Sequence, residues 1–89
     1  MQERFGIAAF RSRQQVLLFE SALKREGLNV HIVSTPRDVA LGCGLSVYFP
    51  IEDAPRVLSA VNRVHPENMI GVYQVDRVGG RSKLTVLRQ

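Results

Sequence analysis

The sequence lacks the features that would place it in a membrane or an oxidising compartment. It has one cysteine in 89 residues, so it cannot form an internal disulfide, and a reducing cytoplasm is its expected location. No apolar run approaches the roughly 18 residues that a membrane-spanning helix needs. Residues 1–4 lead directly into a strand-like segment without the apolar core of a secretory signal. We therefore expect a cytoplasmic protein with no membrane partner.

Motifs for cofactor and metal chemistry are also missing. The chain contains no phosphate-binding glycine loop, no dinucleotide fingerprint, no HExxH motif and no cysteine pair at zinc spacing. Of its two histidines, we interpret His31 as lying on the polar face of a strand. His65 ends a helix, where a cation suits the helix dipole. The sequence thus predicts no cofactor and no metal site.

Length and composition favour one small globular domain that spans residues 1–89. Apolar residues make up 45% of the chain and charged residues 22%, which is typical of a folded protein rather than a disordered one. At 89 residues there is no room for a second domain, and the core is small.

The charge balance is basic, with 12 Lys and Arg against 8 Asp and Glu and a net charge of +4. The cations are scattered, and the densest group lies between Arg77 and Arg88. This pattern favours a basic solvated surface. RNA binding through the C-terminal arginines remains a less favoured alternative.

Apolar periodicity predicts alternating strands and helices. A strand spans 4–10, with Phe5, Ile7 and Ala9 on one face. Ser12 caps the following helix, with Gln15 completing a capping box, and Gly27 ends it. Strands follow at 28–32 and 45–49, separated by a helical turn that begins near Thr35 and closes at Gly42.

The second half of the chain continues the pattern. Asp53 caps a second helix, which stops before Pro66. Its apolar stripe comprises Ala54, Val57, Leu58, Val61 and Val64. A fourth strand spans 70–75, and the turn at Gly79 and Gly80 leads into a fifth strand at 83–87.

This order predicts an α+β protein, a ferredoxin-like split β-α-β sandwich (β-α-β-β-α-β) with an additional C-terminal strand or hairpin. The first and third strands should be central, and the second and fourth should flank them. Both helices should cover one face of the sheet. The residues expected to attach them are Val16, Phe19, Leu23, Val57, Val61 and Val64. The other face, with His31, Tyr48 and Tyr73, should be solvated or form a homodimer surface.

Cys43 is the strongest candidate for chemistry. It lies between Gly42 and Gly44, whose lack of side chains leaves the thiol open and lets backbone N–H groups approach it. Arg37 lies six residues earlier, and a nearby cation lowers a thiol pKa and favours the nucleophilic thiolate. The alternative is a buried, unreactive cysteine beside a turn. Local chemistry leaves both interpretations open.

The same residues carry a resemblance. Thr35-Pro36-Arg37-Asp38 followed by Cys43-Gly44-Leu45 resembles the selenium/sulfur carrier protein-like family, over about residues 5–75. Weaker matches are Phe10 with Ser12, Glu20 before Leu23-Lys24, and Gly71-Val72-Tyr73. Arg13-Gln14 stand where members usually carry Thr-His, and Ser34 stands where many have Pro. Residues 77–89 form an extension outside the resemblance.

The resemblance implies a carrier rather than a stand-alone enzyme. Cys43 would hold a persulfide or perselenide, and Arg37 would stabilise its anion. Thr35, Pro36, Gly42, Gly44 and Ser12 would form the surrounding binding residues. The implied partners are a cysteine desulfurase-like donor and an acceptor protein. The rival hypothesis is a dimeric ferredoxin-like module that binds a small anion or regulates a partner.

Overall fold

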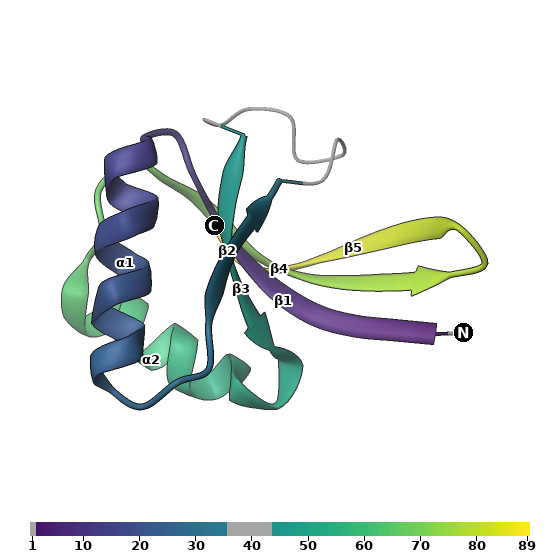
Figure 1. Ribbon diagram of the computed structural model, residues 1–89, viewed down its shortest axis with the longest axis horizontal. Coiled ribbons are helices and arrows are strands. Elements are labelled where there is room, and N and C mark those ends of the chain that lie inside the picture. Colours follow the sequence, from purple (N-terminus) through teal and green to yellow (C-terminus); the bar gives the residue numbers. More distant parts are fainter. Residues whose placement is uncertain (1, 36–43) are drawn as a thin grey trace.

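The computed structural model describes residues 2–35 and 44–89. These residues form one antiparallel sheet of five strands and two α-helices (Figure 1). The elements are β1 (Gln2–Phe10), α1 (Arg13–Arg25), β2 (His31–Ser34), β3 (Leu45–Pro50), a 3-10 turn η1 (Ile51–Asp53), α2 (Ala54–Val64), β4 (Met69–Val78) and β5 (Arg81–Arg88).

The strand order is β2-β3-β1-β4-β5, and it confirms the predicted ferredoxin-like topology with an extra strand. The central strand β1 pairs with both neighbours: Ala8 lies opposite Val47 of β3 and opposite Val72 of β4. Strands β2 and β4 flank the central pair as predicted. The additional strand β5 extends the sheet beyond β4, so β2 and β5 are its edges.

Both helices lie on the same face of the sheet, as predicted (Figure 1). Their buried residues pack against β1, β3 and β4 in a first apolar cluster. Only alternate strand residues take part, because successive side chains of a strand point to opposite faces of the sheet. The cluster consists of Ala8, Phe10, Val16, Phe19, Leu23, Leu28, Val30, Val47, Phe49, Val57, Ala60, Val61 and Val72.

The prediction that Val64 belongs to the core was wrong. Val64 is 46% exposed. It is the last residue of α2, and its side chain lines a shallow surface hollow beside Leu18 and Pro66. The buried residues of α2 are Val57 and Val61 of the predicted stripe together with Ala60, and the final member of the stripe lies at the surface.

The end of α1 explains why β2 begins later than predicted. The N–H of Gly27 donates to the carbonyl of Lys24 (3.0 Å), and the N–H of Leu28 donates to the carbonyl of Leu23 (3.1 Å). This pair of bonds is a Schellman motif, which ends a helix and brings two apolar side chains together across it. Leu28 and Val30 are buried but precede the strand, which starts at His31.

The starts of the helices also differ from the predicted capping. Ser12 and Asp53 occupy the N-cap positions of α1 and α2, but neither side chain makes a capping hydrogen bond. The backbone carbonyl of Ser12 accepts the first hydrogen bond of the helix, from the N–H of Val16 (3.2 Å). Before α2, the unpredicted turn η1 leads the chain into the helix.

The face of the sheet opposite the helices carries a second apolar cluster. Its buried members are Phe5, Ile7, Ala9, Tyr73 and Val75, with Val33, Tyr48, Ile70 and Leu84 packed around them. We call this side the open face, because both helices lie on the other side. Ile7 and Val75 are fully buried there. The open face thus has an apolar core of its own.

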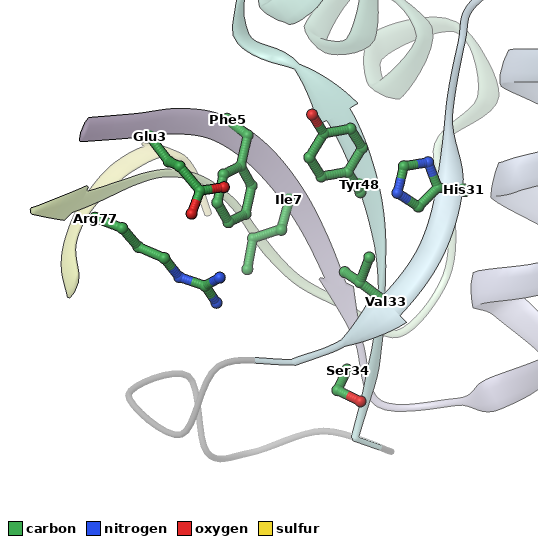
Figure 2. Close-up of a pocket in the computed structure, with 8 residues that line it drawn as sticks. All are labelled: Glu3, Phe5, Ile7, His31, Val33, Ser34, Tyr48 and Arg77. Carbon is green, nitrogen blue, oxygen red and sulfur yellow. The ribbon is translucent and has the colours of Figure 1, made fainter. Parts of the chain in front are cut away.

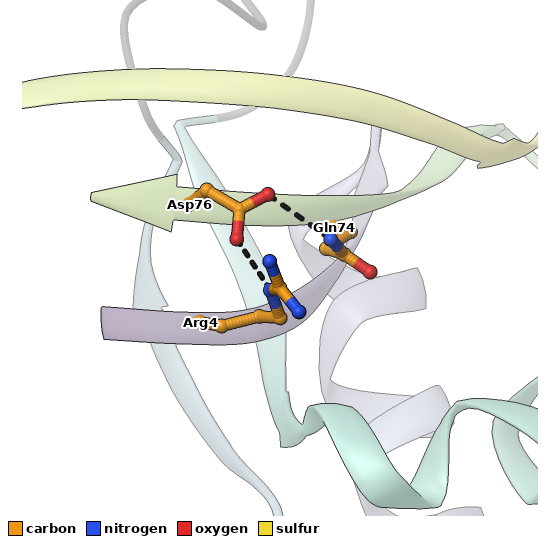
Figure 3. Close-up of polar contacts among 3 residues, drawn as sticks. All are labelled: Arg4, Gln74 and Asp76. Atoms are coloured by element: carbon orange, nitrogen blue, oxygen red, sulfur yellow. Dashed lines mark hydrogen bonds and ion pairs between the residues drawn. The ribbon is translucent and has the colours of Figure 1, made fainter. Parts of the chain in front are cut away.

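The β4–β5 hairpin and the start of β1 extend past the two helices (Figure 1). There, Arg4 Nε lies 2.5 Å from Asp76 Oδ1, and Gln74 Nε2 donates to Asp76 Oδ2 at 3.0 Å (Figure 3). The hydrogen bond from Arg4, followed by that from Gln74, lowers the pKa of Asp76 below its usual value. This cluster links β1 to β4 beyond the region that the helices cover.

No helix among the described residues is long and apolar enough to cross a membrane.

The contact between Gly6 and Phe49 generates a stability prediction. A Cβ at Gly6 would lie 2.1 Å from two carbons of the Phe49 ring. We expect Gly6→Ala to lower the free energy of unfolding by at least about 2 kcal/mol, because overpacking forces the ring or the strand to shift. Urea denaturation measures this change. Adding Phe49→Leu should recover part of the loss, and strictly additive effects would contradict the assigned contact.

A second prediction concerns acid stability. A folded-state pKa below the unfolded one means that ionised Asp76 stabilises the protein above its ordinary pKa of 3.8. That stabilisation is lost as the pH falls through the folded-state pKa. Between neutral and strongly acidic pH, the urea midpoint of the wild type should therefore fall further than that of Asp76→Asn. Glu67→Gln, a matched change at an exposed side chain, should retain the full wild-type decrease.

Candidate functional site

The segment that contains Cys43 connects β2 to β3 in the sequence, and the residues at its two ends are in contact. The N–H of Thr35 donates to the carbonyl of Gly44 at 2.9 Å, directly after β2 and directly before β3. The hydroxyls of Thr35 and Ser46 lie 2.7 Å apart and form a second bond. Gly44 has a φ of +86°, a conformation that glycine adopts without strain. These contacts bring the two ends of the segment together; we call Thr35, Gly44 and Ser46 the loop base.

The loop base is anchored to the central strand. Ser46 is fully buried, and in the sheet it lies opposite Val33 on one side and Ala9 on the other. Because β1 runs antiparallel to β3, the chain leaves β1 and reaches Ser12 at this same end of the sheet (Figure 1). The fold therefore places Ser12, Thr35 and Gly44 at one end of the molecule.

The other predicted site residues, Pro36, Arg37, Gly42 and Cys43, lie outside the described residues. The predicted helical turn between Thr35 and Gly42 falls there as well. Of the candidate site, the structure describes the loop base and the start of α1. We call these two parts together the frame of the site.

A groove of about 200 Å³ on the open face adjoins this frame (Figure 2). Val33 and Ser34, the last residues before Thr35, line one part of it. Its remaining lining residues come from four strands and are Glu3, Phe5, Ile7, His31, Tyr48 and Arg77. The groove thus runs from the beginning of the loop base across β3 and β1 to β4.

Three rings and one guanidinium form a continuous row in the groove; we call it the aromatic row. The His31 ring stacks on that of Tyr48, with centroids 4.3 Å apart and planes at 21°. Tyr48 lies 5.3 Å from Phe5. The guanidinium carbon of Arg77 lies 5.2 Å from the Phe5 ring centroid, which is cation–π geometry.

Sequence reasoning identified part of this groove. Alternation along the strands predicted that His31 and Tyr48 share the face opposite the helices, which the structure confirms. It predicted a solvated or homodimer surface there and did not connect His31 and Tyr48 with Phe5 or Arg77. Those contacts depend on the register between strands far apart in the sequence. The local signal was the aromatic residue at an alternating position in both β1 and β3.

Comparison with known proteins identifies one family. The model of the family described as "Putative Se/S carrier protein-like" matches residues 5–70, well over half of the chain. No curated protein and no solved structure matches the chain. The matched region includes the loop base, Ser12 and the segment with Arg37 and Cys43.

The loop base generates a testable prediction. Thr35→Val preserves the side-chain shape but removes the hydroxyl that bonds to Ser46, leaving a buried hydroxyl without that partner. We expect the free energy of unfolding to fall by about 1–2 kcal/mol in urea denaturation. The double variant Thr35→Val/Ser46→Ala removes both partners and should recover most of the loss. A double variant as unstable as Thr35→Val would show that this bond does not hold the base.

Proposed function

Because the chain belongs to the selenium/sulfur carrier protein-like family, we propose that it carries sulfur or selenium as a persulfide or perselenide on Cys43. The observation that supports this proposal is the family match over residues 5–70, which contains the chain's one cysteine. A chain with a single thiol has one position at which such a group can be held.

The proposed loading step is a transfer between two thiols. The Cys43 thiolate attacks the terminal sulfur of a persulfide on a donor protein and forms a new S–S bond. The donor's own S–S bond breaks, and the electron pair leaves with the donor sulfur as a thiolate. The terminal sulfur changes partner, so the exchange needs no additional oxidant or reductant. Delivery is the same step with Cys43 as the donor: an acceptor thiolate attacks the terminal sulfur on Cys43, and the Cys43 sulfur leaves as a thiolate.

Two features of the frame suit this role. Cys43 precedes Gly44 in the chain, so the proposed carrier residue is joined directly to the loop base. The bond between Thr35 and Ser46 ties that base to a buried position beside β1. A carrier must present its thiol to one partner and then to another. The loop base holds the ends of the Cys43 segment at one end of the sheet, and partners would dock at that end.

The remaining predicted residues have supporting roles in this proposal. Arg37 stabilises the thiolate and the persulfide anion, and the backbone around Gly42 and Gly44 supplies N–H donors. Thr35, Pro36 and Ser12 complete the surface that a partner meets. The proposed partners are a cysteine desulfurase-like donor and an acceptor protein. A second copy of the chain pairing at an edge strand is a further proposed partner.

The test is sulfur loading followed by intact-protein mass spectrometry. The full chain is incubated with a cysteine desulfurase and cysteine, and we expect a mass increase of one sulfur atom. Treatment with a reductant should remove this increment, because a persulfide is reducible. Cys43→Ser should show no increment while retaining the wild-type urea midpoint. No loading of the wild type in the presence of an active desulfurase would contradict the proposal.

The rate of alkylation against pH tests the role of Arg37. A cation near the sulfur favours the thiolate, so Arg37→Gln should shift the alkylation profile to higher pH. Arg25→Gln, which removes an equal charge from the exposed end of α1, should leave the profile unchanged. Slow alkylation that does not respond to Arg37→Gln, together with a destabilised Cys43→Ser, would favour the rival anion-binding module with a packed cysteine.

A further inference from the structure

The last strand of the sheet has a free edge. Within the described residues β5 pairs only with β4, so the N–H and C=O groups along its other side have no strand to bond to. β5 spans eight residues, against four in β2 at the opposite edge. It belongs to the hairpin that projects past both helices (Figure 1). A long edge of this kind can accept an added strand from another chain.

The cations of β5 lie on one face of the sheet. Lys83 lies opposite Asp76, and Asp76 lies opposite Arg4 of β1. Because alternate residues of a strand share a face, Arg4 lies on the same face as Ala8, which packs in the cluster beneath the helices. Lys83, and with it Arg81, therefore lies on the face that carries the helices; we call it the helix side.

The other face of β5 carries apolar side chains. Leu84 lies opposite Val75, and Val86 lies opposite Tyr73. Both of these partners belong to the open-face cluster. Val86 is nevertheless 54% exposed, because it lies on the edge strand. β5 thus alternates cations on the helix side with apolar side chains on the open face.

The cations of β5 have no acidic partner among the described residues. Arg81 and Lys83 are exposed, and neither forms an ion pair with a described residue. The one carboxylate in β4 and β5 is Asp76, whose oxygens bond to Arg4 and Gln74 (Figure 3). Acidic side chains placed beside Arg81 and Lys83 would therefore complement this side of the edge.

We propose that the edge of β5 binds an extended segment of a partner protein in which acidic and apolar residues alternate. The segment adds a sixth strand to the sheet through main-chain hydrogen bonds. Its acidic side chains lie beside Arg81 and Lys83 on the helix side. Its apolar side chains lie beside Leu84 and Val86 on the open face. Opposite charges and apolar pairs at facing positions both stabilise paired strands.

Two other occupants fit this edge less well. β5 contains three cations, Arg81, Lys83 and Arg88, and no carboxylate, so a second copy of β5 would add like charges along the junction. This leaves β2 as the edge for the second copy proposed above. A nucleic acid would match the cations, but it has no peptide groups to pair with the strand edge and would leave Val86 uncovered.

Fluorescence anisotropy with labelled peptides of about eight residues tests the proposal. A peptide that alternates glutamate and valine should bind the wild-type chain. A peptide of the same composition with all its glutamates first should bind about tenfold more weakly, because only the alternating peptide places charge on one face and valine on the other. Equal affinity for the two peptides, or no binding of the alternating peptide at low salt, would overturn the proposal.

Charge reversal tests the assigned face. Arg81→Glu/Lys83→Glu should weaken binding of the glutamate–valine peptide about tenfold or more, and it should bind a lysine–valine peptide more tightly than the wild type does. Arg13→Glu/Arg25→Glu makes the same change in net charge on α1 and should keep the wild-type affinity. An equal loss in this control pair would show only a general charge effect and would overturn the assignment.

Two further measurements carry the test if the reversed variant fails to fold, as judged by its urea transition. Val86→Thr keeps a β-branched side chain at an exposed position, and it should weaken peptide binding about two- to fivefold. Hydrogen exchange should show that the bound peptide protects backbone amides of β5 and leaves those of β2 unchanged. Unaltered affinity of Val86→Thr, or protection confined to β2, would contradict binding at this edge.

The proposal does not depend on sulfur transfer. Cys43→Ser should bind the alternating peptide as the wild type does, and Val86→Thr should still accept sulfur from the desulfurase. Loss of peptide binding in a folded Cys43→Ser variant would overturn the assignment of the peptide to β5, whatever the loading experiment shows.

Discussion

The central strand β1 is buried on both faces, and the rest of the structure depends on this constraint. Every residue from Phe5 to Phe10 is buried. On one side Ala8 and Phe10 belong to the cluster that contacts the helices, and on the other Phe5, Ile7 and Ala9 belong to the open-face cluster. An apolar strand of this kind needs partners at both edges and on both faces, and β3 and β4 supply the pairing.

Burial of β1 on its open side explains the character of that face. In a sandwich of one sheet and one helical layer, the uncovered face is commonly polar. Here the apolar side chains gather in the middle of the face, and His31, Tyr48 and Arg77 of the aromatic row line the groove beside them. Tyr48 is partly exposed, whereas His31 and Arg77 are exposed.

The same strand connects the loop base with the aromatic row. Ala9 lies opposite Ser46 of the loop base, and Phe5, four residues earlier, supports the aromatic row. The groove reaches the loop base through Val33 and Ser34. The end of the sheet proposed for sulfur transfer and the aromatic row on the open face are therefore adjacent surfaces of one small sheet.

Local patterns in the sequence determined the two α-helices and the five strands, though not the turn η1, and they determined the helix-covered face and the family resemblance around Thr35 and Cys43. Alternation and helical spacing are properties of neighbouring residues, so Val16, Phe19 and Leu23 could be placed without knowing the fold. Capping at Ser12 and the position of Val64 were predicted wrongly, because both depend on what the rest of the chain leaves in contact or in solvent. Only the tertiary structure decided the bond between Thr35 and Ser46 and the row from His31 to Arg77. These contacts join residues from different strands, and they depend on which residues of neighbouring strands are paired, which the pattern along a single strand does not reveal.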